Sequence, residues 1–148
     1  MSKGFTLIEL MVVLSIIGVL MALTLTGIGS SRIVARDATR KADLELIRGG
    51  LEIYKADCNS YPAASYTTDI VGGLPLQGIG TPTACATENY YISAIPDDPV
   101  TSRYYRYAPT ATGYEICAAL EKGSGAVTCG GSPNCGTTSL CNYKVTNP

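Results

Sequence analysis

Histidine is absent from this 148-residue sequence. The chain therefore lacks the side chain that most often serves as a general base near neutral pH. It also lacks a glycine-rich phosphate-binding loop after any predicted strand. Its cysteines are expected to be oxidised, so they are not available as nucleophiles. We therefore predict that the protein is not an enzyme and that it uses no cofactor.

The sequence also lacks an excess of charge of either sign, because 11 Lys and Arg side chains face 12 Asp and Glu side chains. Such a balance produces no strong field to attract nucleic acid or anionic lipid. The run Ser102 to Tyr107 is basic and aromatic and could stack on single-stranded nucleic acid. Strand alternation would divide these side chains between two faces, however. We expect no nucleic-acid partner.

Proline is missing before Pro62, so nothing in the first part of the chain forbids a continuous helix. Almost every residue from Phe5 to Ile28 is apolar or a small hydroxyl residue. The charge-free part, residues 10–31, holds about 22 residues and would span about 30 Å as a helix. The sequence predicts one long helix whose first half crosses a membrane, loosened at Gly18, Gly27 and Gly29.

One acidic residue, Glu9, lies near the start of this apolar run. A cleaved secretory signal would have a shorter core and a more basic beginning than Lys3 provides. A plain single-pass anchor leaves Glu9 unexplained, because an unpaired acid in a bilayer costs about 2.5–3.5 kcal/mol. In the third alternative the chain is cut between Gly4 and Phe5, so that the mature protein keeps the apolar run.

The motif K-G-F-T-L-I-E-L resembles the leader of type IV prepilins and of their pseudopilin relatives, and the resemblance covers about residues 1–62. It implies that a prepilin peptidase and methylase cleaves after Gly4 and methylates the new amino group of Phe5. It also implies that Glu9 neutralises that amine, in its own subunit or in a neighbouring one. Residues four apart share a helix face, which allows the pairing within one helix.

The resemblance and the residue pattern together predict an α+β fold, in which a long N-terminal helix packs on a small antiparallel sheet. We divide the chain into a leader, 1–4, a hydrophobic transmembrane or filament-core helix, 5–31, and a globular pilin domain, 32–148. The globular domain comprises an amphipathic helix, 32–58, a loop, 59–89, and an antiparallel sheet with a Cys-rich end, 90–148.

The amphipathic helix carries two apolar stripes at helical spacing. The first consists of Leu44, Ile47, Leu51, Tyr54 and Cys58, and the second of Ala35, Ala42, Leu46 and Ile53. We infer that the first packs on the protein's own sheet and the second on neighbouring helices in a filament; the alternative is a helix fully buried in one domain. The spacing also predicts the ion pairs Lys41–Glu45 and Arg48–Glu52.

Short strands are predicted in the second half of the chain from alternating residues between turn signals. They are residues 90–92, 104–108, 114–120, 126–129 and 140–145. Lys122 to Gly125 is predicted to form a hairpin turn, so that 126–129 returns beside 114–120.

All six cysteines follow the apolar run, which indicates disulfides in an oxidising compartment: Cys58, Cys85, Cys117, Cys129, Cys135 and Cys141. We favour Cys58 with Cys85, because that bond ties a long loop to the helix end. The predicted hairpin favours Cys117 with Cys129, and this leaves Cys135 with Cys141. Six cysteines allow fifteen pairings, and the sequence does not choose among them.

Two alternatives involve metals. Ile95 to Pro99, I-P-D-D-P, resembles a loop that lies near a calcium site in some pilins and pseudopilins. Asp97 and Asp98 offer few of the six to eight oxygens that calcium prefers, so we interpret them as turn-capping residues. The Cys-rich end has no C-x-x-C pair and no histidine for zinc. We expect no metal.

The sequence thus predicts a structural subunit of a type IV pilus, held as a single-pass prepilin in the bacterial cytoplasmic membrane and then polymerised with itself into a helical cell-surface filament. The pilus assembly machinery would be its further partner. The alternatives are a pseudopilin of a type II secretion system, and a minor pilin for DNA uptake or adhesion.

Overall fold

The computed structural model describes residues 4–25, 28–63 and 72–148. The chain divides into two compact units, residues 1–35 and 36–148, which are described separately. The first unit contains helix α1, Leu7–Leu25, and the first residues of helix α2, Ile28–Cys58. Gly18 lies inside α1 and Gly29 inside α2. The predicted continuity between the helices and the loosening at Gly27 fall at 26–27, outside the described residues.

In the described part of the chain, no helix combines the length and the apolar character needed to cross a membrane.

The second unit is built around the C-terminal part of α2. Its buried face is the predicted first stripe, from Leu44, which is 0% exposed, to Cys58. The helix ends at Cys58 because Asn59 adopts a left-handed backbone conformation, φ 60°, and donates its N–H to the carbonyl of Lys55. The predicted end of the helix before Pro62 is therefore confirmed.

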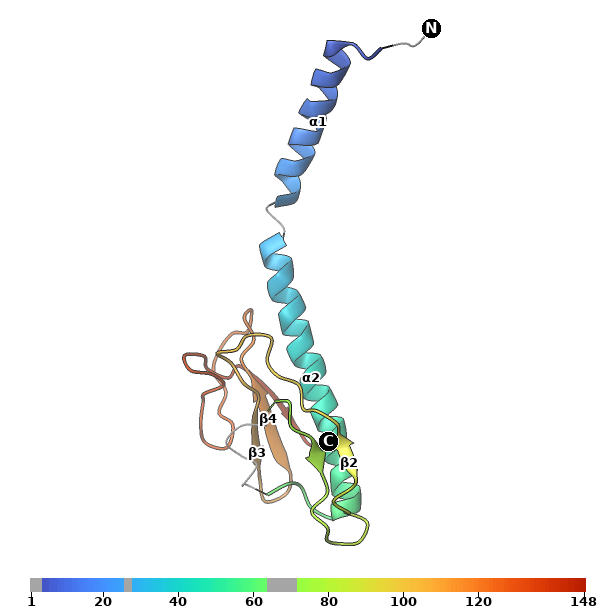
Figure 1. Ribbon diagram of the computed structural model, residues 1–148. Coiled ribbons are helices and arrows are strands. Elements are labelled where there is room, and N and C mark those ends of the chain that lie inside the picture. Colours follow the sequence, from blue (N-terminus) through green and yellow to red (C-terminus); the bar gives the residue numbers. More distant parts are fainter. Residues whose placement is uncertain (1–3, 26–27, 64–71) are drawn as a thin grey trace. The chain divides into compact units, whose positions relative to one another are not determined.

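A three-stranded antiparallel sheet packs on this face of α2 (Figure 1). Its strands, in spatial order, are β3, Arg106–Pro109, β4, Tyr114–Ala118, and β5, Tyr143–Thr146. Ile116 of β4 pairs with Tyr107 on one side and with Val145 on the other. All three side chains are buried in the core beneath α2. The predicted combination of a helix and a small antiparallel sheet is correct.

A second sheet has only two strands, β1, Leu76–Gln77, and β2, Tyr90–Ile92. It lies beside α2 near Gly50, where an added Cβ atom would collide with the side chain of Ile92. Glycine at this position therefore allows β2 to approach the helix closely.

The predicted returning strand at 126–129 is wrong. This segment is irregular, and the second edge of β4 is occupied by β5 instead. Val127 bonds through its N–H to the carbonyl of Cys141, and Cys129 exchanges hydrogen bonds with Ser132 in a tight turn. β5 pairs with β4 over four successive residues, which satisfies more backbone groups than the short hairpin would.

Tyrosine hydroxyls from the globular unit fasten the sheet to α2. Tyr105 donates to Asp43 at 2.6 Å, and Tyr114 donates to Glu52 at 2.8 Å. Glu52 also accepts the hydroxyl of Tyr61. Glu52 thus has partners other than Arg48, which instead pairs with Glu45 at 3.3 Å.

The predicted i, i+4 ion pairs are therefore not the contacts that these side chains make. The Lys41 ammonium lies 5.4 Å from the ring centroid of Tyr143. Tyr61 and Tyr114 occupy the Glu52 carboxylate in place of Arg48, and the bond from Tyr114 also holds α2 against the sheet.

Candidate functional site

The predicted cleavage site lies in an exposed segment that precedes α1. Gly4 and Phe5 are outside the helix, and the Phe5 side chain is 90% exposed. A Cβ atom added at Gly4 would meet nothing within 4 Å. A peptidase could therefore reach the bond between them, and its cleavage would leave the first helical residue, Leu7, in place.

Glu9 closes a capping box with Thr6 at the N-terminus of α1. Its carboxylate accepts the Thr6 N–H at 2.8 Å and the Thr6 hydroxyl at 2.7 Å, and the Glu9 N–H donates to that hydroxyl at 3.3 Å. The spacing T-x-x-E is the sequence signature of this motif. Glu9 therefore has hydrogen-bond partners in Thr6 before any cleavage frees the Phe5 amine. Pairing with the amine stays a prediction.

The side chains of α1 are exposed on every side of the helix, at all positions from Leu7 to Leu23. Large apolar residues dominate, with Leu7 74%, Ile8 71% and Leu23 71% exposed. A helix that is apolar all round belongs in a nonpolar environment, either a membrane or a bundle of other helices. Within its own unit, the described residues leave these apolar side chains of α1 exposed.

The predicted second stripe of α2 is also exposed. Leu46 is 52% and Ile53 is 58% exposed, and Ala42 and Gly49 lie on the same face. The side chain missing at Gly49 leaves open space between the two larger residues. The alternative of a helix buried on all faces is therefore wrong. We name Ala42, Leu46, Gly49 and Ile53 the outer face of α2.

A buried cluster of charges joins α2 to two distant loops. The Arg40 guanidinium, 0% exposed, binds both carboxylate oxygens of Asp98, at 2.7 and 2.9 Å. It also binds Asp37 at 2.8 Å and Glu121 at 2.9 Å. Arg36 forms a second two-bond contact with Glu121, with both distances 2.6 Å. These five residues are named the Arg40 cluster below.

Sequence reasoning overlooked this cluster, although a signal was present. Arg40 lies four residues before Leu44, and Asp37 three before Arg40, so both continue the buried stripe of α2 towards its N-terminus. A charged residue on an otherwise apolar stripe indicates a buried ion pair, since an unpaired charge there would be very costly.

Acid should weaken this cluster. The Arg36 guanidinium, followed by that of Arg40, lowers the pKa of Glu121 from 4.5 to about 2. Burial opposes ionisation of Asp37, but the N–H groups of Glu121 and Lys122 and the Arg40 guanidinium lower its pKa overall. The resulting stability is complete above the unfolded-state pKa of 4.5 and is lost as the pH falls towards about 2.

Urea unfolding at a series of pH values tests this prediction. The free energy of unfolding should fall between pH 4.5 and about 2. A Glu121→Gln variant should lose less over the same interval, because it lacks the group whose pKa is lowered. Equal pH dependence in both proteins would contradict the assignment to Glu121.

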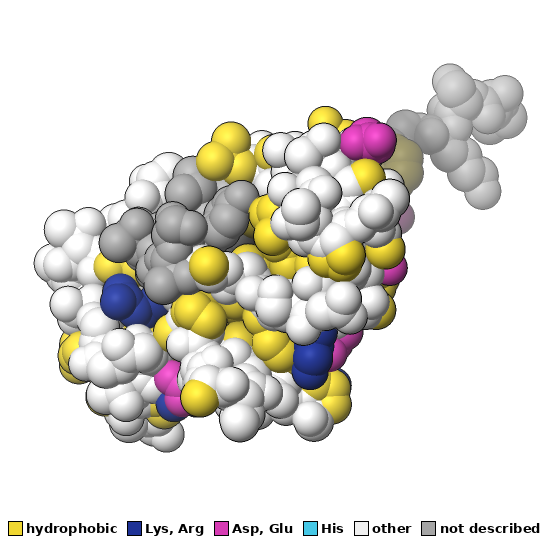
Figure 2. Space-filling view, turned by 90° about the horizontal axis from the view of Figure 1, so that it is seen from below, with side chains coloured by type: hydrophobic (Ala, Val, Ile, Leu, Met, Phe, Trp, Pro, Cys, Tyr) yellow, Lys and Arg dark blue, Asp and Glu magenta, His cyan; other side chains and the backbone are white. Residues whose placement is uncertain are grey.

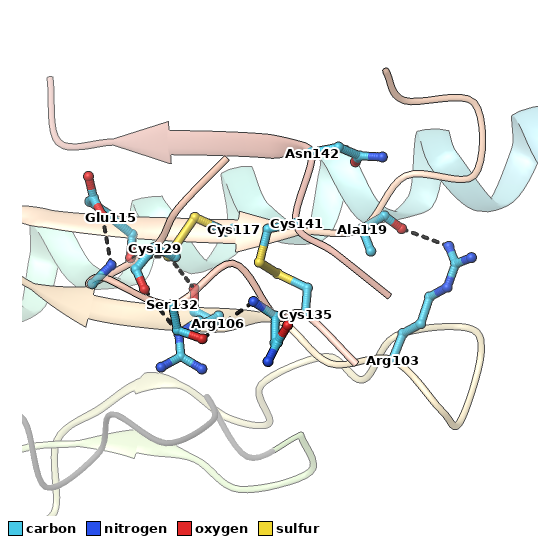
Figure 3. The surroundings of a disulfide bond; sticks show 12 residues. Arg103, Arg106, Glu115, Cys117, Ala119, Cys129, Ser132, Cys135, Cys141 and Asn142 are labelled. Carbon is cyan, nitrogen blue, oxygen red and sulfur yellow. Dashed lines mark hydrogen bonds between the residues drawn. A yellow bond between two sulfur atoms is a disulfide. The ribbon is translucent and has the colours of Figure 1, made fainter. Parts of the chain in front are cut away.

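The six cysteines form three disulfides, Cys58–Cys85, Cys117–Cys129 and Cys135–Cys141, the same pairs that the sequence favours. The last two bonds form a separate buried cluster with Ala108, Ala119 and Val127 on the face of the sheet opposite α2. Figure 3 shows the two disulfides in front of the strands, with α2 behind. The Cys-rich end is thus a third layer, and it covers a sheet face that would otherwise be open.

The Cys117–Cys129 bond forms for a reason other than the predicted hairpin. Arg106 of β3 donates from its side chain to the carbonyl of Cys129 at 3.1 Å (Figure 3). Glu115 of β4 accepts the N–H of Gly130 at 2.9 Å. These bonds hold the turn around Cys129 against the face of β3 and β4 that lies opposite α2. The Cys129 sulfur therefore reaches Cys117 from that face of the sheet.

The Arg and Tyr run at 102–107 does not form a platform for bases. Tyr105 and Tyr107 are each 1% exposed, within the core beneath α2. Arg103 donates to the carbonyl of Ala119 at 2.8 Å. On the face drawn in Figure 2, basic and acidic side chains are scattered among apolar and uncharged ones. These contacts assign the run to the scaffold.

In the I-P-D-D-P loop, the Asp98 carboxylate binds the Arg40 guanidinium. Besides the two bonds to Arg40, Asp98 accepts the N–H of Val100 at 2.8 Å, which is the predicted turn-capping role. The side chain of Asp97 lies against Gly72, where an added Cβ atom would collide with it. Within residues 4–25, 28–63 and 72–148, no three His, Cys, Asp or Glu residues are arranged to hold a metal ion.

Comparison with known families gives two matches along this chain. The prokaryotic N-terminal methylation motif matches residues 1–25. The family described as type II secretion system (T2SS), protein G, matches residues 29–128. The two matches together cover the exposed N-terminal segment, both helices and most of the globular unit.

Curated relatives agree with this result. The type II secretion system core protein G of Pseudomonas aeruginosa is 32% identical over 112 residues, which cover 75% of this chain and 77% of the relative. The core protein G of Escherichia coli K12 is 30% identical over 124 residues, covering 82% and 83%. That of Vibrio cholerae is 32% identical over 111 residues, covering 72% and 70%. No solved structure matches the chain significantly.

Proposed function

Because the chain belongs to the type II secretion system protein G family, we propose that it is a pseudopilin subunit, which polymerises with itself into a short periplasmic filament of a secretion system. The match to protein G over residues 29–128 carries this proposal. The preference for a surface pilus that the sequence alone suggested is replaced by its stated alternative, since the similar curated proteins carry the name of a secretion component.

The geometry supports polymerisation through helices. The uncovered apolar side chains of α1 and the outer face of α2 require partners, and further copies of the same chain can supply them. Each copy would then use one surface of its helix against a different surface of the next copy. Heterologous contacts whose rotation does not close a ring produce a helical filament.

The N-terminal segment supports processing before assembly. The methylation-motif match at residues 1–25 agrees with anchoring in the cytoplasmic membrane, cleavage after Gly4 and methylation of Phe5 by a prepilin peptidase. Because Thr6 and Glu9 lie after the cleaved bond, the capping box is retained in the mature subunit. Cleavage would therefore change the charge at the N-terminus without shortening α1.

Mass spectrometry of the assembled protein tests this processing. We expect an N-terminus at Phe5 that carries one extra methyl group. Protein from cells that lack prepilin peptidase should retain Met1 to Gly4 and should remain in the membrane fraction. An unprocessed N-terminus in assembled filaments, or a cut after the apolar run, would contradict the proposal.

A substitution at Glu9 can separate its helix-capping role from its predicted role in neutralising the Phe5 amine. A Glu9→Gln variant keeps a side chain that can complete the capping box but loses the charge that would neutralise the Phe5 amine. We expect this variant to be processed normally and to yield at least about tenfold fewer filaments, since an unpaired buried amine costs more than about 1.4 kcal/mol. Filament yield can be counted by electron microscopy.

The matched control is Thr6→Val, which removes the capping hydroxyl but leaves the Glu9 charge. It should assemble better than Glu9→Gln. If Glu9→Gln assembles normally and Thr6→Val does not, the carboxylate acts only as a helix cap and the amine-pairing prediction is wrong.

Cells that lack this protein distinguish the secretion function from the surface-pilus alternative. If the protein is a secretion pseudopilin, proteins normally released to the medium should accumulate in the periplasm, while the number of surface pili stays unchanged. Loss of surface pili with normal secretion would instead establish the type IV pilus subunit. A minor pilin that captures DNA receives no support from the buried tyrosines of the 102–107 run.

A further inference from the structure

Three carboxylates from three separate segments converge on one buried cation. Asp37 precedes Arg40 by one turn of α2, Asp98 belongs to the loop after β2, and Glu121 follows β4. The side chain of Arg40 is 0% exposed and that of Asp98 is 1% exposed. The guanidinium is thus the junction at which both loops are attached to the helix.

The hydrogen-bonding capacity of this junction is almost completely used. Arg40 makes four hydrogen bonds to carboxylate oxygens, out of five N–H donors. Backbone N–H groups satisfy further oxygens, from Glu121 and Lys122 to Asp37 and from Val100 to Asp98. A planar, permanently charged guanidinium suits such paired contacts better than an ammonium.

The loop that contains Asp98 is the I-P-D-D-P loop, which resembles one that lies near a calcium site in some pilins and pseudopilins. Calcium takes six to eight oxygen ligands at about 2.3–2.6 Å. Both oxygens of Asp98 are instead bonded to Arg40, whose positive charge would repel a metal ion at the same place. The residues present do not fit calcium.

We propose that the Arg40 guanidinium is the permanent cation of this loop, and that it makes the folding of the globular unit independent of divalent metal. The cation is covalently part of α2, so it cannot be lost by dilution or chelation. The loops after β2 and β4 therefore keep their positions at any calcium concentration. This inference concerns the folding of the chain and does not depend on the proposed secretion function.

The first test uses the full chain in detergent, with its disulfides intact, and calcium chloride as the probe. We expect isothermal titration to show no saturable binding, and the Tm to agree within about 1 °C between excess EDTA and millimolar calcium. A calcium site that is nearly saturated would raise the Tm by roughly 10 °C. Saturable binding, or a Tm that falls in EDTA, would overturn the proposal.

The second test removes the cation itself. In Arg40→Met the apolar stem is retained but the three carboxylates lose their shared partner, so the Tm should fall strongly at pH 7. The loss should shrink near pH 3, because Asp37 and Glu121, whose pKa values Arg40 helps to lower, bind protons more readily once that cation is removed.

A Leu44→Ala variant provides the matched control, because it removes buried volume from the next turn of the same stripe without changing any charge. Its loss should be the same at both pH values. If the loss in Arg40→Met is equally independent of pH, Arg40 acts by packing alone and the proposal fails. If Arg40→Met does not fold at pH 7, the calcium measurements on the unmodified chain still decide.

Discussion

A Leu46→Glu/Ile53→Glu double variant is expected to remain folded and to lose filament assembly. Both side chains are more than half exposed in the monomer, so replacing them should change the free energy of unfolding by less than about 0.5 kcal/mol each. In a filament they would be covered by a neighbouring helix. Two unpaired carboxylates buried in that contact would oppose assembly by several kcal/mol, and yield should fall by at least about a hundredfold.

Filaments counted by electron microscopy and proteins released to the medium measure this effect, and circular dichroism confirms that the variant is folded. The control is Thr112→Glu, which adds a carboxylate in the exposed turn between β3 and β4. It should assemble normally. If the double variant also assembles normally, the outer face of α2 is not a subunit contact.

Each disulfide, removed on its own, is expected to destabilise the globular unit by an amount that increases with the length of the loop that it closes. The cysteines are 27 residues apart in Cys58–Cys85, 12 in Cys117–Cys129 and 6 in Cys135–Cys141. Because a cross-link restricts the unfolded chain more when its loop is longer, the losses should be about 3.5, 3 and 2.5 kcal/mol respectively.

Paired Cys→Ala variants, unfolded in guanidinium chloride, provide the measurement. Substituting both cysteines of a pair avoids leaving a free thiol that could exchange with another bond. All six residues are nearly or fully buried, so each pair also contributes packing. If removing Cys135–Cys141 lowers the free energy of unfolding most, then packing in the Cys-rich third layer contributes more to stability than the restriction of the unfolded chain does.

Because the Cys-rich end forms a third layer on the sheet, the globular unit has two small hydrophobic cores. One core lies between α2 and the sheet, and the other, built around the Cys117–Cys129 and Cys135–Cys141 bonds, lies on the opposite face. A small domain buries a limited fraction of its surface, so covalent bonds compensate for the modest amount of apolar packing in the second core.

Features that depend on local spacing can be predicted from the amino-acid sequence alone. The period of 3.6 residues places Leu44, Ile47 and Leu51 on one side of α2 and Leu46 and Ile53 on the other, and the structure agrees. The end of α2 follows from Asn59 and from the proline soon after it. The T-x-x-E spacing is a local signal of the same kind, because a helix cap is completed within four residues, but sequence reasoning missed it.

The contacts between distant segments, by contrast, could not be predicted from the sequence. The bonds of Arg40 to Asp98 and to Glu121 join residues 58 and 81 positions apart, and several other carboxylates had the same chemistry. The pairing of β4 with β5, instead of with the segment after Lys122, was equally hard to predict. Turn residues next to a strand do not show which segment will pair with its free edge. The spacing of apolar residues predicts which face of a helix or strand is buried. Which segment covers that face depends on the packing of the whole chain.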